Sequence, residues 1–68
     1  MTNKALLDKR IAKSGYKKSY IAKVLGITPE TLSRKISNNS YFNINEMRAL
    51  CELLGINTPE EKDLIFFD

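Results

Sequence analysis

This 68-residue chain lacks most of the side chains on which enzyme active sites depend. It has no histidine, the residue most often used as a general acid or base near neutral pH. It also has no glycine-rich phosphate loop, no nucleophile beside a base and no group of side chains at metal-ligand spacing. These absences argue against an enzyme, and the sequence predicts no cofactor and no metal site.

Cysteine and long apolar runs are scarce as well. The single cysteine, Cys51, cannot form an internal disulfide, and its position on the apolar side of an expected helix predicts a small core residue. No apolar run approaches the length of a membrane span, and the N-terminal MTNKALLDKR lacks the apolar segment of a secretory signal. We therefore expect a soluble protein of a reducing cytoplasm, with no membrane partner.

Acidic residues are rare in the first half of the chain. Residues 1–37 hold nine Lys and Arg against two Asp and Glu, whereas residues 38–68 hold two against six. A basic half is typical of a protein that meets a polyanion on one side, and chance asymmetry in a small domain is the alternative. The length allows a single domain, 1–68, and 43% hydrophobic with 28% charged residues indicates a globular one.

Glycine and proline divide the sequence into five segments with helical periodicity, and none alternates as a strand does. The expected helices cover about residues 3–14, 17–26, 28–37, 42–55 and 58–67, which predicts an all-α fold. The apolar side of the second helix is expected to comprise Ile21, Val24 and Leu25.

Most of the expected helices begin with a recognisable signal. Thr28 and Thr58 are good N-caps followed by proline, and Asn43 with Glu46 has the spacing of a capping box. Lys17, at the start of the second helix, is a poor N-cap and places a cation at the positive end of the helix dipole. A broken local rule of this kind points to a role other than folding.

Residues 17–37 carry the pattern of two helices that cross steeply at a tight turn. Ala22 is small enough to lie at the closest approach of the helices, and Gly26 tolerates the positive φ that the turn favours. Ile27 and Leu32 can then bury the corner beneath the turn. The sequence therefore predicts a helix-turn-helix at about residues 17–37.

This pattern resembles the lambda-repressor/Cro class (XRE-like) of helix-turn-helix domains. The resemblance begins in GYKKSYIAKVLGIT and continues over nearly the whole chain, through TLSRKI, YFNINEM, LCELLGI and TPEEKDLIFF. It implies a compact five-helix DNA-binding domain and a transcriptional regulator, Cro-like or repressor-like, of phage, prophage or bacterial origin. Such a protein would act on nucleoid DNA in the cytoplasm of a bacterial cell.

The resemblance also implies that the third helix enters the DNA major groove, with its N-terminal half toward the base edges. Arg34 can donate two hydrogen bonds to guanine, and Glu30 can accept one from cytosine. Glu30 has a second interpretation, as a favourable charge in the first turn of the helix. The residues expected to read bases are Pro29, Glu30, Thr31, Ser33 and Arg34.

Phosphate contacts are implied at both ends of the motif. A phosphate at the start of the second helix would explain the poor cap, because Lys17 and Lys18 would then serve the ligand. The polar turn after the third helix either approaches the same DNA backbone or is an ordinary loop. The expected phosphate-binding residues are Lys17, Lys18, Ser19, Thr28, Lys35, Asn38, Asn39, Ser40 and Tyr41. Other basic residues, expected to supply only a general field or solvated faces, are Lys4, Lys9, Arg10, Lys13 and Lys23.

One position departs from the pattern of the class. Many members have an apolar residue three positions after the equivalent of Leu32, where this chain has Lys35, and here the apolar residue comes one later, at Ile36. Both spacings keep the two apolar residues on one helical face. The shift therefore predicts a slightly rotated third helix.

Function and assembly each have an alternative. The rival to DNA binding is a protein-binding helix-turn-helix module, such as an antirepressor or antitoxin-like partner, but the polar and basic second and third helices favour DNA. Regulators of this class usually act in pairs on near-palindromic operators, so a weak or DNA-induced homodimer is expected. Phe66 and Phe67 are the candidate dimer contact, or else they fold back onto the first and fourth helices.

Overall fold

The computed structural model describes residues 1–67, and over that range it consists of five α-helices without strands. The helices are α1 (Lys4–Ser14), α2 (Lys18–Leu25), α3 (Pro29–Ile36), α4 (Ile44–Leu54) and α5 (Pro59–Phe66). The predicted all-α class is confirmed. None of these helices is long and apolar enough to cross a membrane, as judged over the described residues.

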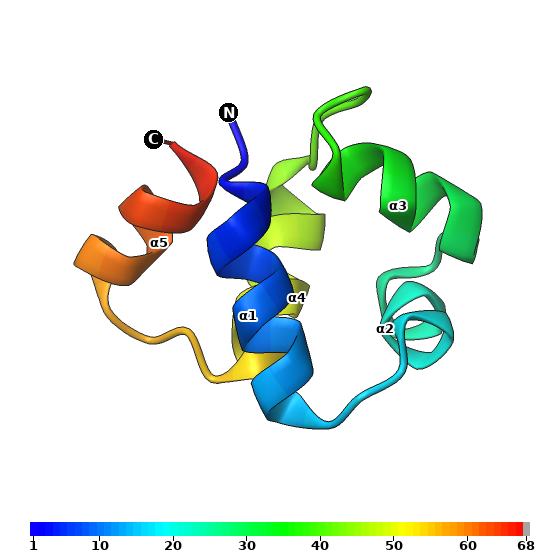
Figure 1. Cartoon of the computed structure of the whole chain (residues 1–68), viewed down its shortest axis with the longest axis horizontal. Coiled ribbons are helices and arrows are strands. Elements are labelled where there is room, and N and C mark those ends of the chain that lie inside the picture. The colour runs from blue at the N-terminus through cyan, green and yellow to red at the C-terminus, as the bar shows by residue number, and fades with distance from the viewer. Residues whose placement is uncertain (68) are drawn as a thin grey trace.

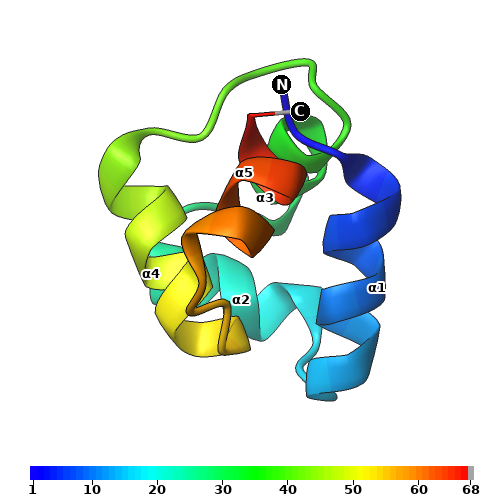
Figure 2. The same ribbon diagram turned by 90° about the vertical axis from the view of Figure 1, so that its left-hand side faces the viewer.

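The helices enclose a single small core. In Figures 1 and 2, α5 lies on one side of α1 and α4, whereas α2 and α3 lie on the other. Every helix contributes at least one fully buried side chain to the space between them, and Ile56 adds one from the α4–α5 connection. These large, fully buried residues are Leu7, Ile21, Leu32, Ile36, Leu50, Ile56 and Ile65. Because so few residues hold the core, truncating one of them should cost about 2–5 kcal/mol.

The helix starts follow the local signals in the sequence. The Thr28 side chain accepts a hydrogen bond from the backbone N–H of Thr31, and Asn43 with Glu46 forms a complete capping box. Lys17 occupies the N-cap position of α2 but forms no side-chain capping bond there within the described chain. The sequence alone therefore predicts these starts, including the uncapped one.

Two predictions about the helix faces are wrong. Val24 is exposed, because the buried face of α2 is centred on Ile21 and Ala22, and Val24 lies about a third of a turn away from it. Arg10 is structural: its guanidinium donates to Glu61 Oε2 at 2.8 Å and to the Leu54 carbonyl at 2.7 Å. It thereby ties α1 to the end of α4 and to α5.

Candidate nucleic-acid interface

A tight turn at Gly26 sets the angle between α2 and α3. Gly26 has a φ of 75°, in the left-handed region that favours glycine, and its N–H donates to carbonyls in the last turn of α2. The next N–H, that of Ile27, donates to the Ala22 carbonyl at 2.9 Å. The fully buried Ala22 side chain leaves room for α3 to approach. The turn thus presents α3 on the surface beside α2, as Figure 1 shows.

The outer face of α3 is polar. Leu32 and Ile36 are buried, and the opposite side of the helix exposes Glu30, Ser33 and Arg34. Pro29 is exposed at the first turn, whereas Thr31 is half-buried and accepts a hydrogen bond from the Thr28 hydroxyl at 2.9 Å. Of the residues expected to read bases, four are therefore solvent-accessible in the free protein and Thr31 is partly covered.

Arg34 and Glu30 form an ion pair along the exposed face of α3. The Arg34 Nη2 lies 2.9 Å from Glu30 Oε1, at the (i, i+4) spacing that allows such pairs on one helix. Both side chains are more than half exposed, so the pair contributes at most about 1 kcal/mol. A base or phosphate that offers Arg34 a better acceptor can displace Glu30 at little cost.

The start of α2 combines an uncapped helix end with positive charge. Lys17, Lys18 and Ser19 are all exposed there. The backbone N–H groups of a first helical turn have no partner within the helix, and a bound anion can accept from them. The site thus has the charge and the donors that a phosphate needs, and no side-chain cap at Lys17 occupies it in the described chain.

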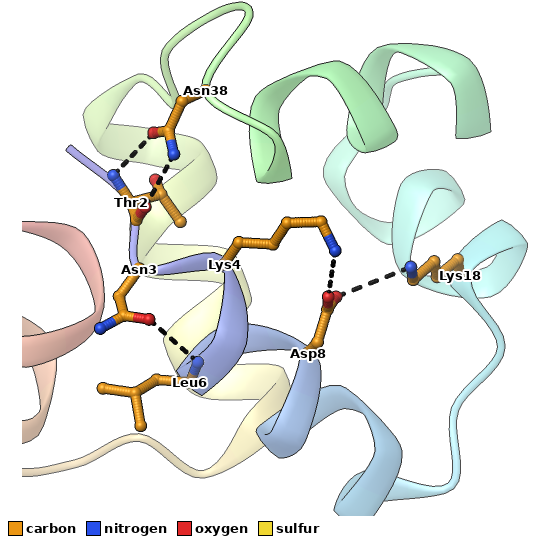
Figure 3. A network of polar contacts seen from close by, with 7 residues as sticks. All are labelled: Thr2, Asn3, Lys4, Leu6, Asp8, Lys18 and Asn38. Carbon is orange, nitrogen blue, oxygen red and sulfur yellow. Dashed lines mark hydrogen bonds and ion pairs between the residues drawn. The ribbon is translucent and has the colours of Figure 1, made fainter.

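Asp8 of α1 lies beside this site, a placement that the sequence did not reveal. Figure 3 shows its carboxylate between two lysines, with Lys4 Nζ at 2.5 Å from Oδ2 and Lys18 Nζ at 3.7 Å from Oδ1. The hydrogen bond from Lys4 and the charge of Lys18 outweigh burial and lower the pKa of Asp8. Oδ1 itself is buried and has no donor within hydrogen-bond distance among residues 1–67, so Lys18 acts on it mainly through its charge. The Lys4–Asp8 spacing predicts the first contact, but nothing local predicts the second.

Lys35 does not face the solvent as a phosphate ligand would. Its Nζ lies 2.6 Å from Glu46 Oε1, and the two side chains are only 12% and 8% exposed. The sequence led us to expect that Lys35 contacts phosphate, whereas the structure turns its ammonium group toward α4. The signal in the sequence for an internal partner was that Lys35 stands at a position where many members of the class have an apolar residue.

Asn38 also has an internal partner. Its side-chain Nδ2 donates to the Thr2 carbonyl at 2.8 Å, and its Oδ1 accepts from the Thr2 N–H at 2.9 Å, as Figure 3 shows. Asn38 has a φ of 66°, a conformation that asparagine tolerates better than most residues. The sequence led us to expect that this amide binds phosphate, whereas in the structure both of its polar atoms contact Thr2. Three neighbours that the sequence placed in the same group remain exposed, namely Asn39, Ser40 and Tyr41.

The two C-terminal phenylalanines have different environments. Phe66 is 4% exposed and packs edge-to-face on Phe42, with ring centroids 5.9 Å apart. It folds back into the core, which is the second of the two alternatives that the sequence left open for it. Phe67 is 61% exposed and borders a shallow hollow of about 220 Å³ that Ile44 also lines. Tyr41 and Met1 are exposed around an adjoining hollow that shares Phe67.

A buried alanine and a left-handed glycine at a tight turn, followed by a capped helix with a polar outer face, define a helix-turn-helix protein. The comparison with protein families agrees, since the Cro/C1-type HTH DNA-binding domain matches residues 6–61. The chain belongs to this family and is a DNA-binding helix-turn-helix regulator. Searches of curated proteins and of solved structures returned no match.

Proposed function

We propose that this protein is a sequence-specific regulator of transcription that binds double-stranded DNA with α3 in the major groove. The observation that carries the proposal is that α3, whose exposed face is polar, lies beside α2, whose start is uncapped and basic (Figure 1). A helix in the groove and a helix N-terminus on the backbone are the contacts that such a motif makes. The regulator is Cro-like or repressor-like, encoded by a phage, a prophage or its host, and acts in the cytoplasm on nucleoid DNA.

In the proposed complex, base reading and phosphate binding fall to different residues. Arg34 leaves Glu30 and donates to guanine, while Glu30, Ser33, Pro29 and the accessible part of Thr31 complete the reading surface. The phosphate contacts come from two places on either side of α3. These residues are Lys17, Lys18 and Ser19 at the start of α2, and Thr28, Asn39, Ser40 and Tyr41 around α3.

A second copy of the chain is the proposed partner on DNA. The exposed apolar residues Phe67, Ile44 and Met1 border two adjoining hollows near the C-terminal end of α5 and the start of α4. Neither hollow is lined by a residue of α3, so a pair can form there and leave both copies of α3 free. Two copies related by a two-fold axis would read a near-palindromic operator.

The alternative of a protein-binding module has less support. A helix that binds a partner protein usually presents aromatic or aliphatic anchors. The large apolar residues that are exposed among residues 1–67 lie outside α3, and the residues that α3 exposes are polar apart from Pro29. Charge and polarity on the presented face therefore favour DNA.

Binding selection from random duplex DNA tests the proposal. The wild-type protein should enrich a near-palindromic site at low salt, and Arg34→Ala should relax the preference at one base pair of each half-site by about 1–3 kcal/mol. Lys9→Ala is the control, because it removes one positive charge from an exposed position on α1, away from the proposed reading and pairing surfaces. It should leave the base preference unchanged. If the wild-type protein enriches no sequence, the proposed function is wrong.

A further inference from the structure

The contact between Lys35 and Glu46 joins the last turn of α3 to the first turn of α4. It is the most enclosed of the ion pairs within residues 1–67, since both side chains are nearly covered. A buried ion pair contributes little net stability, because desolvation offsets much of the attraction between the charges. Its presence at the end of the proposed recognition helix therefore calls for a reason other than stability.

The Glu46 carboxylate is also held by a contact that does not involve Lys35. Its Oε1 also accepts from the Asn43 N–H at 2.9 Å, and the Glu46 N–H donates back to Asn43 Oδ1 at 2.7 Å. This capping box fixes the carboxylate to the backbone of α4. Lys35 thus binds an acceptor whose position is set by α4, and the pair relates the two helices to each other.

The direction in which the Lys35 side chain projects allows its contact with Glu46 to restrict rotation of α3 about the helix axis. Leu32 and Ile36 are one helical turn apart and anchor α3 to the core along a single row. A single row allows a helix to roll about its own axis. Lys35 projects about a quarter of a turn to one side of that row, whereas Arg34 projects nearly opposite to it. A fixed contact at Lys35 therefore resists rolling and sets the direction of Arg34.

We propose that Lys35 and Glu46 are positioning residues that fix the rotation of α3 and thereby decide which of its side chains meet the base edges. The inference rests on the proposed function, since it assigns a role in sequence preference. It also explains why a lysine stands where the class has an apolar residue: the lysine reaches a carboxylate on α4 that an apolar side chain could not bind.

The charge state of the pair is consistent with this role. Burial alone would raise the pKa of Glu46, but the hydrogen bonds from Lys35 and from the Asn43 N–H outweigh it and hold the pKa below its ordinary value. Glu46 is therefore ionised at neutral pH and attracts Lys35 under the conditions in which DNA is bound.

The test compares the double variant Lys35→Met/Glu46→Gln with the wild-type protein. Methionine keeps an unbranched chain without the ammonium group, and glutamine keeps an oxygen for the Asn43 N–H, so the fold should survive without either charge. Lys23→Met is the control, because it removes a lysine from an exposed position on α2. Each protein is put through the selection from random duplex DNA, and its affinity for the wild-type site is measured as a function of salt.

The double variant should discriminate less among bases at the positions read by α3, by about fivefold or more, while Lys23→Met keeps the wild-type preference. The salt dependence should be the same for the wild-type protein and for Lys35→Met, because Lys35 touches no phosphate.

An unchanged base preference in the double variant would overturn the inference. So would a decrease of about 0.9 in the salt slope of Lys35→Met for each bound copy, which is the sign of a lost phosphate contact. If Lys35→Met does not fold, Glu46→Gln alone provides the same comparison of base preference. Failure of the proposed function is separate, because then the wild-type protein itself selects no site.

Discussion

Replacing Asp8 with asparagine should strengthen DNA binding while weakening the fold. The carboxylate lies between Lys4 and Lys18, and Lys18 is one of the residues proposed to bind phosphate at the start of α2. Lys18 must give up its attraction to Asp8 when it turns to a phosphate. Asparagine has nearly the same size and no charge, so it removes this competition without leaving a cavity.

The size of the effect follows from the exposure of the partners. The Lys4 and Lys18 side chains are about half exposed, and ion pairs of this kind contribute roughly 0.2–1 kcal/mol each. Losing the contact with Lys4 should lower the free energy of unfolding by an amount in that range. Releasing Lys18 should raise DNA affinity by up to about fivefold for each bound copy, since 1.4 kcal/mol corresponds to a factor of ten.

The pH dependence of stability has a definite sign. The hydrogen bond from Lys4 and the charge of Lys18 overcome the effect of burial and lower the pKa of Asp8 in the folded protein. Asp8 therefore stabilises the fold fully above its ordinary pKa of 3.8, and this contribution is lost as the pH falls through the lower folded value. The stability difference between the wild-type protein and Asp8→Asn should accordingly be present at pH 7 and shrink in strong acid.

Fluorescence anisotropy with the selected duplex measures the affinity, and urea unfolding at low salt measures the stability, because urea is uncharged and does not screen the ion pairs. Asp63→Asn is the matched control, because it removes the same charge from an exposed position on α5, across the molecule from α2 (Figure 1). Asp8→Asn should bind more tightly than this control at equal salt. If its affinity is equal to that of Asp63→Asn or weaker, Lys18 does not exchange Asp8 for a phosphate, and the reasoning is refuted.

Three further predictions concern assembly, the turn after α3 and the pair with α4. Phe67→Ser should weaken self-association in sedimentation experiments, whereas Phe66→Ala should instead lower the free energy of unfolding by about 3–5 kcal/mol; equal association of Phe67→Ser and the wild type would contradict the proposed dimer surface. Asn38→Ala should be less stable than Asn38→Gly by about 1 kcal/mol in chemical unfolding, because both lose the bonds to Thr2 but glycine adopts the positive φ freely. Glu46→Gln should lower the free energy of unfolding by its largest amount above pH 4.5, and this difference from the wild-type protein should decrease at lower pH, because protonation of Glu46 also breaks its ion pair with Lys35. A difference that does not change with pH would count against an ionised pair.

Local signals in the sequence determined the helices and the kind of motif they form. The N-cap at Thr28, the capping box of Asn43 and Glu46, and the glycine at Gly26 each act within a few residues, and all three formed as expected. Their physical basis is the backbone N–H groups and φ angles of one turn, which depend little on the rest of the protein. The family resemblance rested on these same signals, and the match over residues 6–61 agrees with it.

Only the tertiary structure decided how the polar side chains are used. Lys35 was expected to point to a phosphate, yet it reaches Glu46 on the next helix. Asn38, in the middle of the chain, binds the backbone of Thr2 near the N-terminus. The sequence suggested no role for Asp8, which the structure places beside Lys18. A lysine, an asparagine or an aspartate has the same local preference whether it meets solvent or a partner. Its role depends on which groups packing brings within hydrogen-bond reach, and these partners lie from ten to 36 positions away along the chain.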